Sequence, residues 1–198
     1  MHSASLHSMT PSVPSDPSPL VRVIGVLTAV WCVGFAVVNV VFELTGRFHD
    51  GPHADYAAGI TVMNWLVVGL KLLGAAIALR SIADRSRWPS PSALAVLLWG
   101  AFATIGLYAA GSVAQWIGMA FGLISHEGKL GATEVAYVLL FIVAAVGFGV
   151  LAISYSHRLR IRKSYAIIGT LGAPLMLLLV LVIAPSVLVA LGVMPAIE

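Results

Sequence analysis

Five long apolar stretches, separated by short polar segments, make up most of the chain. Each stretch is about 20 residues or longer, which is the length that an α-helix needs to cross a bilayer. The predicted spans are 20–43, 56–80, 92–124, 133–156 and 165–191.

This pattern predicts an all-α fold: a polytopic integral membrane protein with a compact bundle of five transmembrane helices in residues 20–198. Buried helices of a soluble protein are a poor alternative, because five such runs with almost no charge are not typical of a soluble core. Residues 1–19 are rich in Ser and Pro and lack an apolar pattern, so we expect a disordered tail there.

Composition supports a membrane protein and excludes several other classes. Hydrophobic residues make up 60% of the chain, charged residues 10%, and the mean hydropathy is +0.99. The single cysteine, Cys32, excludes a disulfide framework, a CxxC redox pair and a cysteine-based zinc site. The pI near 9.3 comes from basic residues that flank the spans, so we expect no nucleic-acid partner. The lipid bilayer is the expected partner, and a protein partner or a homo-oligomer stays open.

The basic residues also predict how the chain crosses the membrane. Eight of them flank the spans on one side, near Arg22 and in the segments 80–87 and 158–163, whereas the other side has only Arg47 and Lys129. Basic residues concentrate in cytoplasmic loops. We therefore expect a cytoplasmic N-terminus and an external C-terminus. The bias toward Ala, Val, Leu, Gly and Arg fits a bacterium with GC-rich DNA, so its cytoplasmic membrane is the expected location.

Polar residues recur at helical spacing on single faces of the first three spans. One interpretation is a file of polar groups that lines an outward-opening cavity; the alternative is ordinary hydrogen bonding between packed helices. The candidate residues for a ligand or ion path are Lys71, Tyr108, Asn64, Gln115, Asn39 and Glu43.

Lys71 stands out because it lies near the middle of its span, where a charge needs a partner or a function. Arg80, nine residues later, marks the predicted cytoplasmic boundary, so Lys71 lies about 13 Å deeper in the membrane, a distance that its side chain cannot comfortably cover. We expect its ammonium to point into the bundle. The expected partners are Tyr108, Thr104, a water, or the Thr170 carbonyl that Pro174 frees from its helical hydrogen bond.

Histidines and acids cluster in the two predicted outer loops, where they could hold a divalent metal such as zinc. The Gly51-Pro52 pair prevents a helical histidine pair in the first loop, so a solvated polar loop is the open alternative. The candidate metal ligands are His49, His53, His126, Asp50 and Glu127.

Three stretches resemble the DUF3995 family of small bacterial membrane proteins. They read WCVGFAVVNVVFELTGRF, LVVGLKLLGAAIALRS and GLYAAGSVAQ, and together they cover the first three predicted spans. The second is the most similar, with a lysine followed by small residues. The resemblance implies a bacterial membrane protein but no activity or catalytic residues, because the family has no assigned function.

Neither hydrolase, P-loop nor dinucleotide-binding motifs occur in the sequence, so no catalytic residue is assigned. The favoured function is that of an accessory or assembly protein, or of a protein that binds a lipid or small ligand. A transporter or channel that uses the polar file around Lys71 is an alternative. A membrane enzyme acting on a lipid or quinone-like substrate is another.

Overall fold

The computed structural model describes residues 16–47, 54–83, 89–123 and 131–192. Within these ranges the chain forms five long α-helices, a short 3₁₀ turn (Ala54–Tyr56) and no strand, which confirms the all-α class. All five helices are long and apolar enough to cross a membrane. They are α1 (Pro19–Leu44), α2 (Ala57–Ile82), α3 (Pro91–Ala120), α4 (Ala132–Arg158) and α5 (Lys163–Ala190).

Two helices begin at the same kind of N-terminal signal. The hydroxyl oxygens of Ser18 and Ser90 accept hydrogen bonds from the backbone N–H groups of Val21 and Ala93, at 3.4 and 3.3 Å. A proline follows each serine, and proline is suited to the first helical position because its N–H group is not needed there. These capping residues explain why the observed starts of α1 and α3 lie within one residue of the predicted ones.

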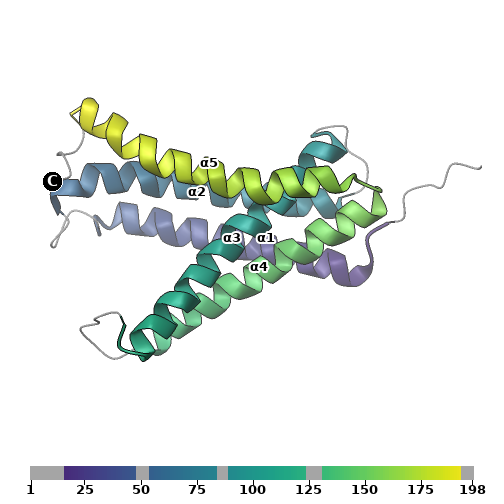
Figure 1. The fold of residues 1–198 in the computed structure, drawn as a ribbon, viewed down its shortest axis with the longest axis horizontal. Coiled ribbons are helices and arrows are strands. Elements are labelled where there is room, and N and C mark those ends of the chain that lie inside the picture. The colour runs from purple at the N-terminus through teal and green to yellow at the C-terminus, as the bar shows by residue number, and fades with distance from the viewer. Residues whose placement is uncertain (1–15, 48–53, 84–88, 124–130, 193–198) are drawn as a thin grey trace, which may run out of the picture.

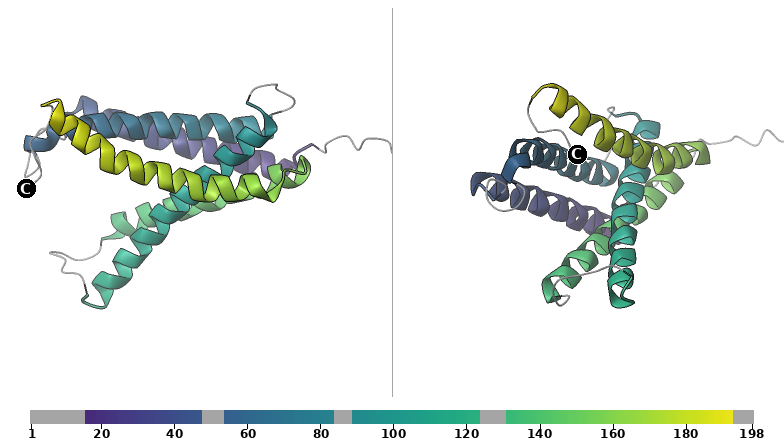
Figure 2. Two further views of the ribbon diagram at one scale, coloured as in Figure 1. Left: turned by 45° about the horizontal axis from the view of Figure 1, so that its top comes forward. Right: turned by 60° about the vertical axis from the view of Figure 1, so that its left-hand side comes forward.

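The helices pack as hairpins that cross one another (Figure 1). Helices α1 and α2 lie side by side, and α3 and α4 form a second antiparallel pair. The two pairs meet near the beginning of α1 and the end of α4. From there the α3–α4 pair diverges from α1 and α2, as both views in Figure 2 show. Helix α5 packs mainly against α3.

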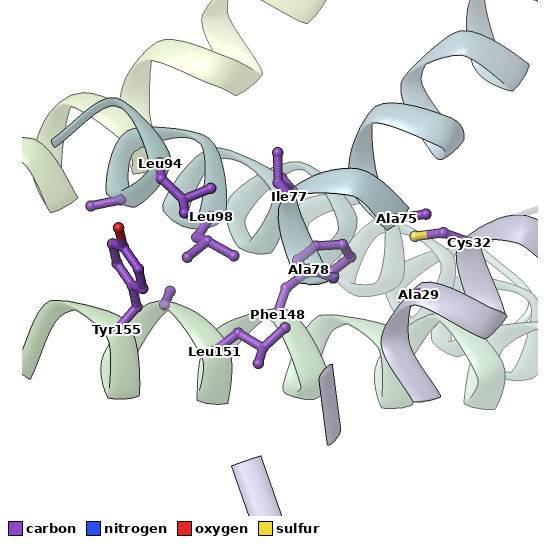
Figure 3. Close-up of a cluster of buried hydrophobic side chains, with 12 residues drawn as sticks. Ala29, Cys32, Ala75, Ile77, Ala78, Leu94, Leu98, Phe148, Leu151 and Tyr155 are labelled. Carbon is purple, nitrogen blue, oxygen red and sulfur yellow. The ribbon is translucent and has the colours of Figure 1, made fainter. Parts of the chain in front are cut away.

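The core lies where the first four helices meet (Figure 3). Phe148 of α4 and Leu98 of α3 are fully buried there and pack with small residues of the neighbouring helices. The cluster comprises Ala29, Cys32, Ala75, Ile77, Ala78, Leu94, Ala95, Leu98, Phe148, Leu151, Ala152 and Tyr155. It fixes the relative positions of α1, α2 and α4, on which the candidate site depends.

Helix α5 approaches α3 closely because glycines lie at the contact, Gly169 on α5 and Gly100 on α3. A Cβ atom at Gly169 would collide with the Val96 carbonyl oxygen and would lie 2.8 Å from Trp99 Cβ and 3.1 Å from Gly100 N. Small residues allow this kind of backbone contact between membrane helices. The remaining face of α5 is largely exposed, as expected for a helix that contacts lipid.

The described basic residues, Lys71 apart, gather mostly at one end of the molecule, where α1 and α5 begin and α2 and α4 end (Figure 1). We call this the basic end and define it by Arg22, Arg80, Arg158, Arg160, Arg162 and Lys163. Arg158 also fastens two helices together there, because its Nη2 donates a hydrogen bond of 2.8 Å to the Ser81 carbonyl oxygen. Arg47 lies at the opposite end, after α1.

Candidate functional site

Lys71 lies in a cage of three aromatic rings. Its Nζ is 4.2 Å from the ring centroid of Trp31, 4.6 Å from that of Phe35 and 4.7 Å from that of Phe141. Trp31 and Phe35 are one turn apart on α1, and Phe141 comes from α4. The faces of aromatic rings are electron-rich and attract cations, most strongly where water is excluded. The cage therefore stabilises a charge that lipid would not.

The rings of this aromatic cage (Trp31, Phe35 and Phe141) also pack on one another. Trp31 and Phe141 meet edge to face, with centroids 5.1 Å apart, and the Trp31 and Phe35 centroids are 4.6 Å apart. The ring of Tyr108 in α3 also packs against Phe141, with centroids 4.4 Å apart. Such pairs add stability beyond burial alone. The contacts join α1, α3 and α4 and restrict the rings that face Lys71.

The partners of Lys71 differ from those expected. Its ammonium does lie between helices, but none of the described residues accepts a hydrogen bond from it. Tyr108 packs its ring against Phe141, and its hydroxyl makes no hydrogen bond to Lys71. Thr170 belongs to α5, which packs on α3, whereas the cage is built from α1 and α4.

Sequence reasoning missed the three caging rings. A signal existed, because Trp31 and Phe35 are spaced one helical turn apart in the span adjacent to Lys71. The signal is weak because polar residues mark the conspicuous face of the first span, and the rings project beside that face. Phe141 could not be identified at all, since nothing local in the sequence specifies how α4 crosses α1.

Three of the other candidate residues, together with Thr61, bring the polar faces of α1 and α2 together. The Glu43 carboxylate accepts hydrogen bonds from Thr61 Oγ1 at 2.8 Å and from Asn64 Nδ2 at 3.2 Å. Asn64 Nδ2 also donates to the Asn39 carbonyl oxygen at 3.0 Å. This acidic cluster (Asn39, Glu43, Thr61 and Asn64) lies near the end of α1 that is remote from the basic end.

The acidic cluster and Lys71 are separated along the α1–α2 interface. Ala36 and Val68 lie between them in the two helices, and their side chains are only 3% and 5% exposed. One turn further on, Cys32 Sγ packs against Gly74. The predicted polar file is therefore interrupted by well-packed apolar side chains.

Gln115 does not join either group. Its side chain is exposed on α3, seven residues beyond Tyr108 and on the part of α3 that diverges from α1 and α2. The helical spacing that placed Gln115 and Tyr108 on one face was sound, but that face does not meet the acidic cluster.

An open groove runs between α1 and α4 beside the aromatic cage. Its volume is about 480 Å³. Trp31 and Phe35 belong both to the groove wall and to the aromatic cage. Their rings therefore contact Lys71 and also border the groove. The lining residues are Trp31, Gly34, Phe35, Val38, Thr133, Ala136, Tyr137 and Leu140.

The predicted metal ligands His49, His53, His126, Asp50 and Glu127 lie outside the described residues. Within the described ranges, no group of three or more His, Cys, Asp or Glu side chains could hold a metal ion. The metal site stays a prediction from the sequence.

The fold and the site together define a multi-pass α-helical membrane protein with a half-buried cation and an apolar groove. No family model, no curated protein and no solved structure matches the chain. The resemblance to the DUF3995 family accordingly stays a prediction.

Proposed function

We propose that this is a non-catalytic membrane protein that binds a lipid or another apolar small molecule in the groove between α1 and α4. The observation that carries the proposal is the groove itself, whose volume of about 480 Å³ falls within the range of ligand pockets.

The lining of the groove matches an apolar ligand. Gly34 and Ala136 leave room on the two helices, and a Cβ atom at Gly34 would meet no atom within 4 Å. Val38, Tyr137 and Leu140 add exposed apolar surface around this space. In a membrane, an acyl chain or a ring of similar width fits such a surface.

The aromatic cage supports the same function by stiffening the groove wall. Lys71 holds Trp31 and Phe35 from the side of α2, while Phe141 contacts Trp31 from α4. A wall that is already ordered loses less conformational entropy when a ligand binds. The half-buried charge thus acts on binding through the rings that it orders.

A transport path along the α1–α2 interface has less support. Such a path would connect Lys71 with Glu43, but Ala36 and Val68 fill the interface between them. No arrangement of the described side chains favours a membrane enzyme over a binding protein. The accessory or assembly role is compatible with ligand binding and is part of the proposal.

The gathering of basic residues at one end supports a cytoplasmic location for that end and for the N-terminus. The C-terminus then lies outside, and the membrane would be the cytoplasmic membrane of a bacterium. The acidic cluster would then lie in the outer half of the bilayer, and the proposed groove would open there.

Two matched glycine substitutions test the groove. Gly34→Leu fills it, whereas Gly69→Leu adds the same side chain on α2, where a Cβ atom also meets nothing within 4 Å. Lipid that remains bound after purification in detergent is counted by native mass spectrometry. We expect Gly34→Leu to lose at least one bound molecule that wild type and Gly69→Leu keep. Equal retention in all three proteins would refute the proposal.

A further inference from the structure

Four of the five helices end in the same backbone turn, and one of them departs from the usual residue. The second residue after helices α1, α3 and α5 is a glycine with positive φ: 66° at Gly46, 69° at Gly122 and 70° at Gly192. Glycine is the ordinary choice because it has no Cβ to oppose this conformation. After α4 the same position holds Arg160, with φ 50°.

The turn after α4 is otherwise an ordinary helix end. The Ile161 N–H donates to the Ser156 carbonyl oxygen at 3.0 Å, as Arg47 donates to Phe42 after α1 at 3.1 Å. Ile161 also packs against the hydrophobic core, so the turn is held in place. An unfavourable backbone conformation that persists in a well-held turn indicates that the side chain serves a purpose.

Arg160 is one of three exposed cations within four residues, together with Arg162 and Lys163. No carboxylate lies on the described part of α5 or in the turn before it. Of the carboxylates whose side chains are described, Glu43 is engaged at the other end of the molecule, whereas Asp16 precedes α1 at the basic end but belongs to neither α4 nor α5. The turn is thus a compact positive surface.

An exposed apolar stripe continues from this surface into the membrane. Ile167, Leu171 and Leu175 follow Lys163 at intervals of four residues, so they share its face of α5. Their side chains are 59%, 66% and 66% exposed, and α5 packs mainly against α3. A cationic cluster above an apolar stripe complements an amphiphile that has an anionic head and a long apolar chain.

We propose that the α4–α5 turn is a binding site for an anionic phospholipid. Arg160, Arg162 and Lys163 hold the phosphate-bearing headgroup, and an acyl chain lies along Ile167, Leu171 and Leu175. Arginine binds phosphate through paired N–H donors, which explains why arginine replaces glycine at the strained position. This site is at the basic end and is separate from the groove between α1 and α4.

The test compares two lipids with identical acyl chains, phosphatidylglycerol and phosphatidylcholine. Binding to the full chain in a neutral detergent is measured by native mass spectrometry. We expect preferential binding of phosphatidylglycerol. Arg160→Gly should weaken it about fivefold, and the triple variant Arg160→Gln, Arg162→Gln, Lys163→Gln about a hundredfold. Arg47→Gln, which removes a charge at the opposite end, should leave binding unchanged.

The Arg160→Gly variant also separates lipid binding from folding. Glycine suits the backbone at this position, so the thermal stability of the lipid-free variant should equal or exceed that of wild type. Unchanged phosphatidylglycerol affinity in this variant and in the triple variant would overturn the proposal. Equal binding of the two lipids, or displacement of phosphatidylglycerol by excess inorganic phosphate, would also overturn it.

Discussion

The ammonium of Lys71 lies 4.2 Å from the ring centroid of Trp31, its nearest aromatic neighbour in the cage. This contact joins α2 to α1 at the wall of the groove, and it gives a mid-span lysine a place inside the protein. The charge is held by ring faces, so it requires no carboxylate partner.

The first prediction measures this contact with a double-mutant cycle. Trp31→Leu should lower the free energy of unfolding more in the wild-type background than in a Lys71→Met background, by about 1–2 kcal/mol. Unfolding in mixed micelles supplies the four free energies. The pair Trp65→Leu and Lys71→Met serves as a control, because Trp65 is on α2 outside the cage and is 49% exposed. Coupling as small as in the control would show that the rings do not hold the charge.

The second prediction concerns the contact between α3 and α5. Gly169→Ala should destabilise the protein by about 1–3 kcal/mol, because the added methyl group would collide with the α3 backbone. Gly172→Ala, on the same helix, meets no atom within 4 Å and should be neutral or slightly stabilising. Thermal unfolding in one detergent compares the two variants. Equal losses of stability would mean that α5 does not dock on α3 through Gly169.

The third prediction concerns the acidic cluster. Asn64→Leu removes the donor shared by Glu43 and Asn39, so the free energy of unfolding should fall by about 1–2 kcal/mol. Gln115→Leu is the matched control, since Gln115 is exposed and should tolerate the change. An Asn64 variant as stable as the Gln115 variant would contradict the arrangement of α1 against α2.

The fourth prediction concerns orientation. A cysteine at Arg162 should be protected from a membrane-impermeant thiol reagent in intact cells, and a cysteine at Arg47 should react. The native Cys32 is 1% exposed and should not contribute to labelling. Labelling at Arg162 with protection at Arg47 would reverse the orientation and place the basic end outside.

The sequence predicted the five helices well because each is specified locally. Long apolar runs, serine caps and prolines fix where α1 and α3 start, and they do so without reference to the rest of the fold. The polar contact between α1 and α2 was also predictable. Glu43 and Asn64 each belong to a polar face of their own span, and the two residues meet in the structure.

The aromatic cage and the groove were not predictable, because both depend on how α4 crosses α1. Phe141 lies 70 residues from Lys71 in the chain, and periodicity alone cannot pair them. The same limitation explains why Gln115 was grouped with residues that it does not approach: α3 diverges from α1 and α2 at that depth.

A density map of the protein in lipid nanodiscs tests the central claim most directly. We predict a continuous, chain-like density in the groove beside Gly34 and Ala136, with Lys71 Nζ enclosed by Trp31, Phe35 and Phe141. A map in which α1 and α4 close on each other and leave no groove, or in which the Lys71 ammonium faces lipid away from the three rings, would contradict the account.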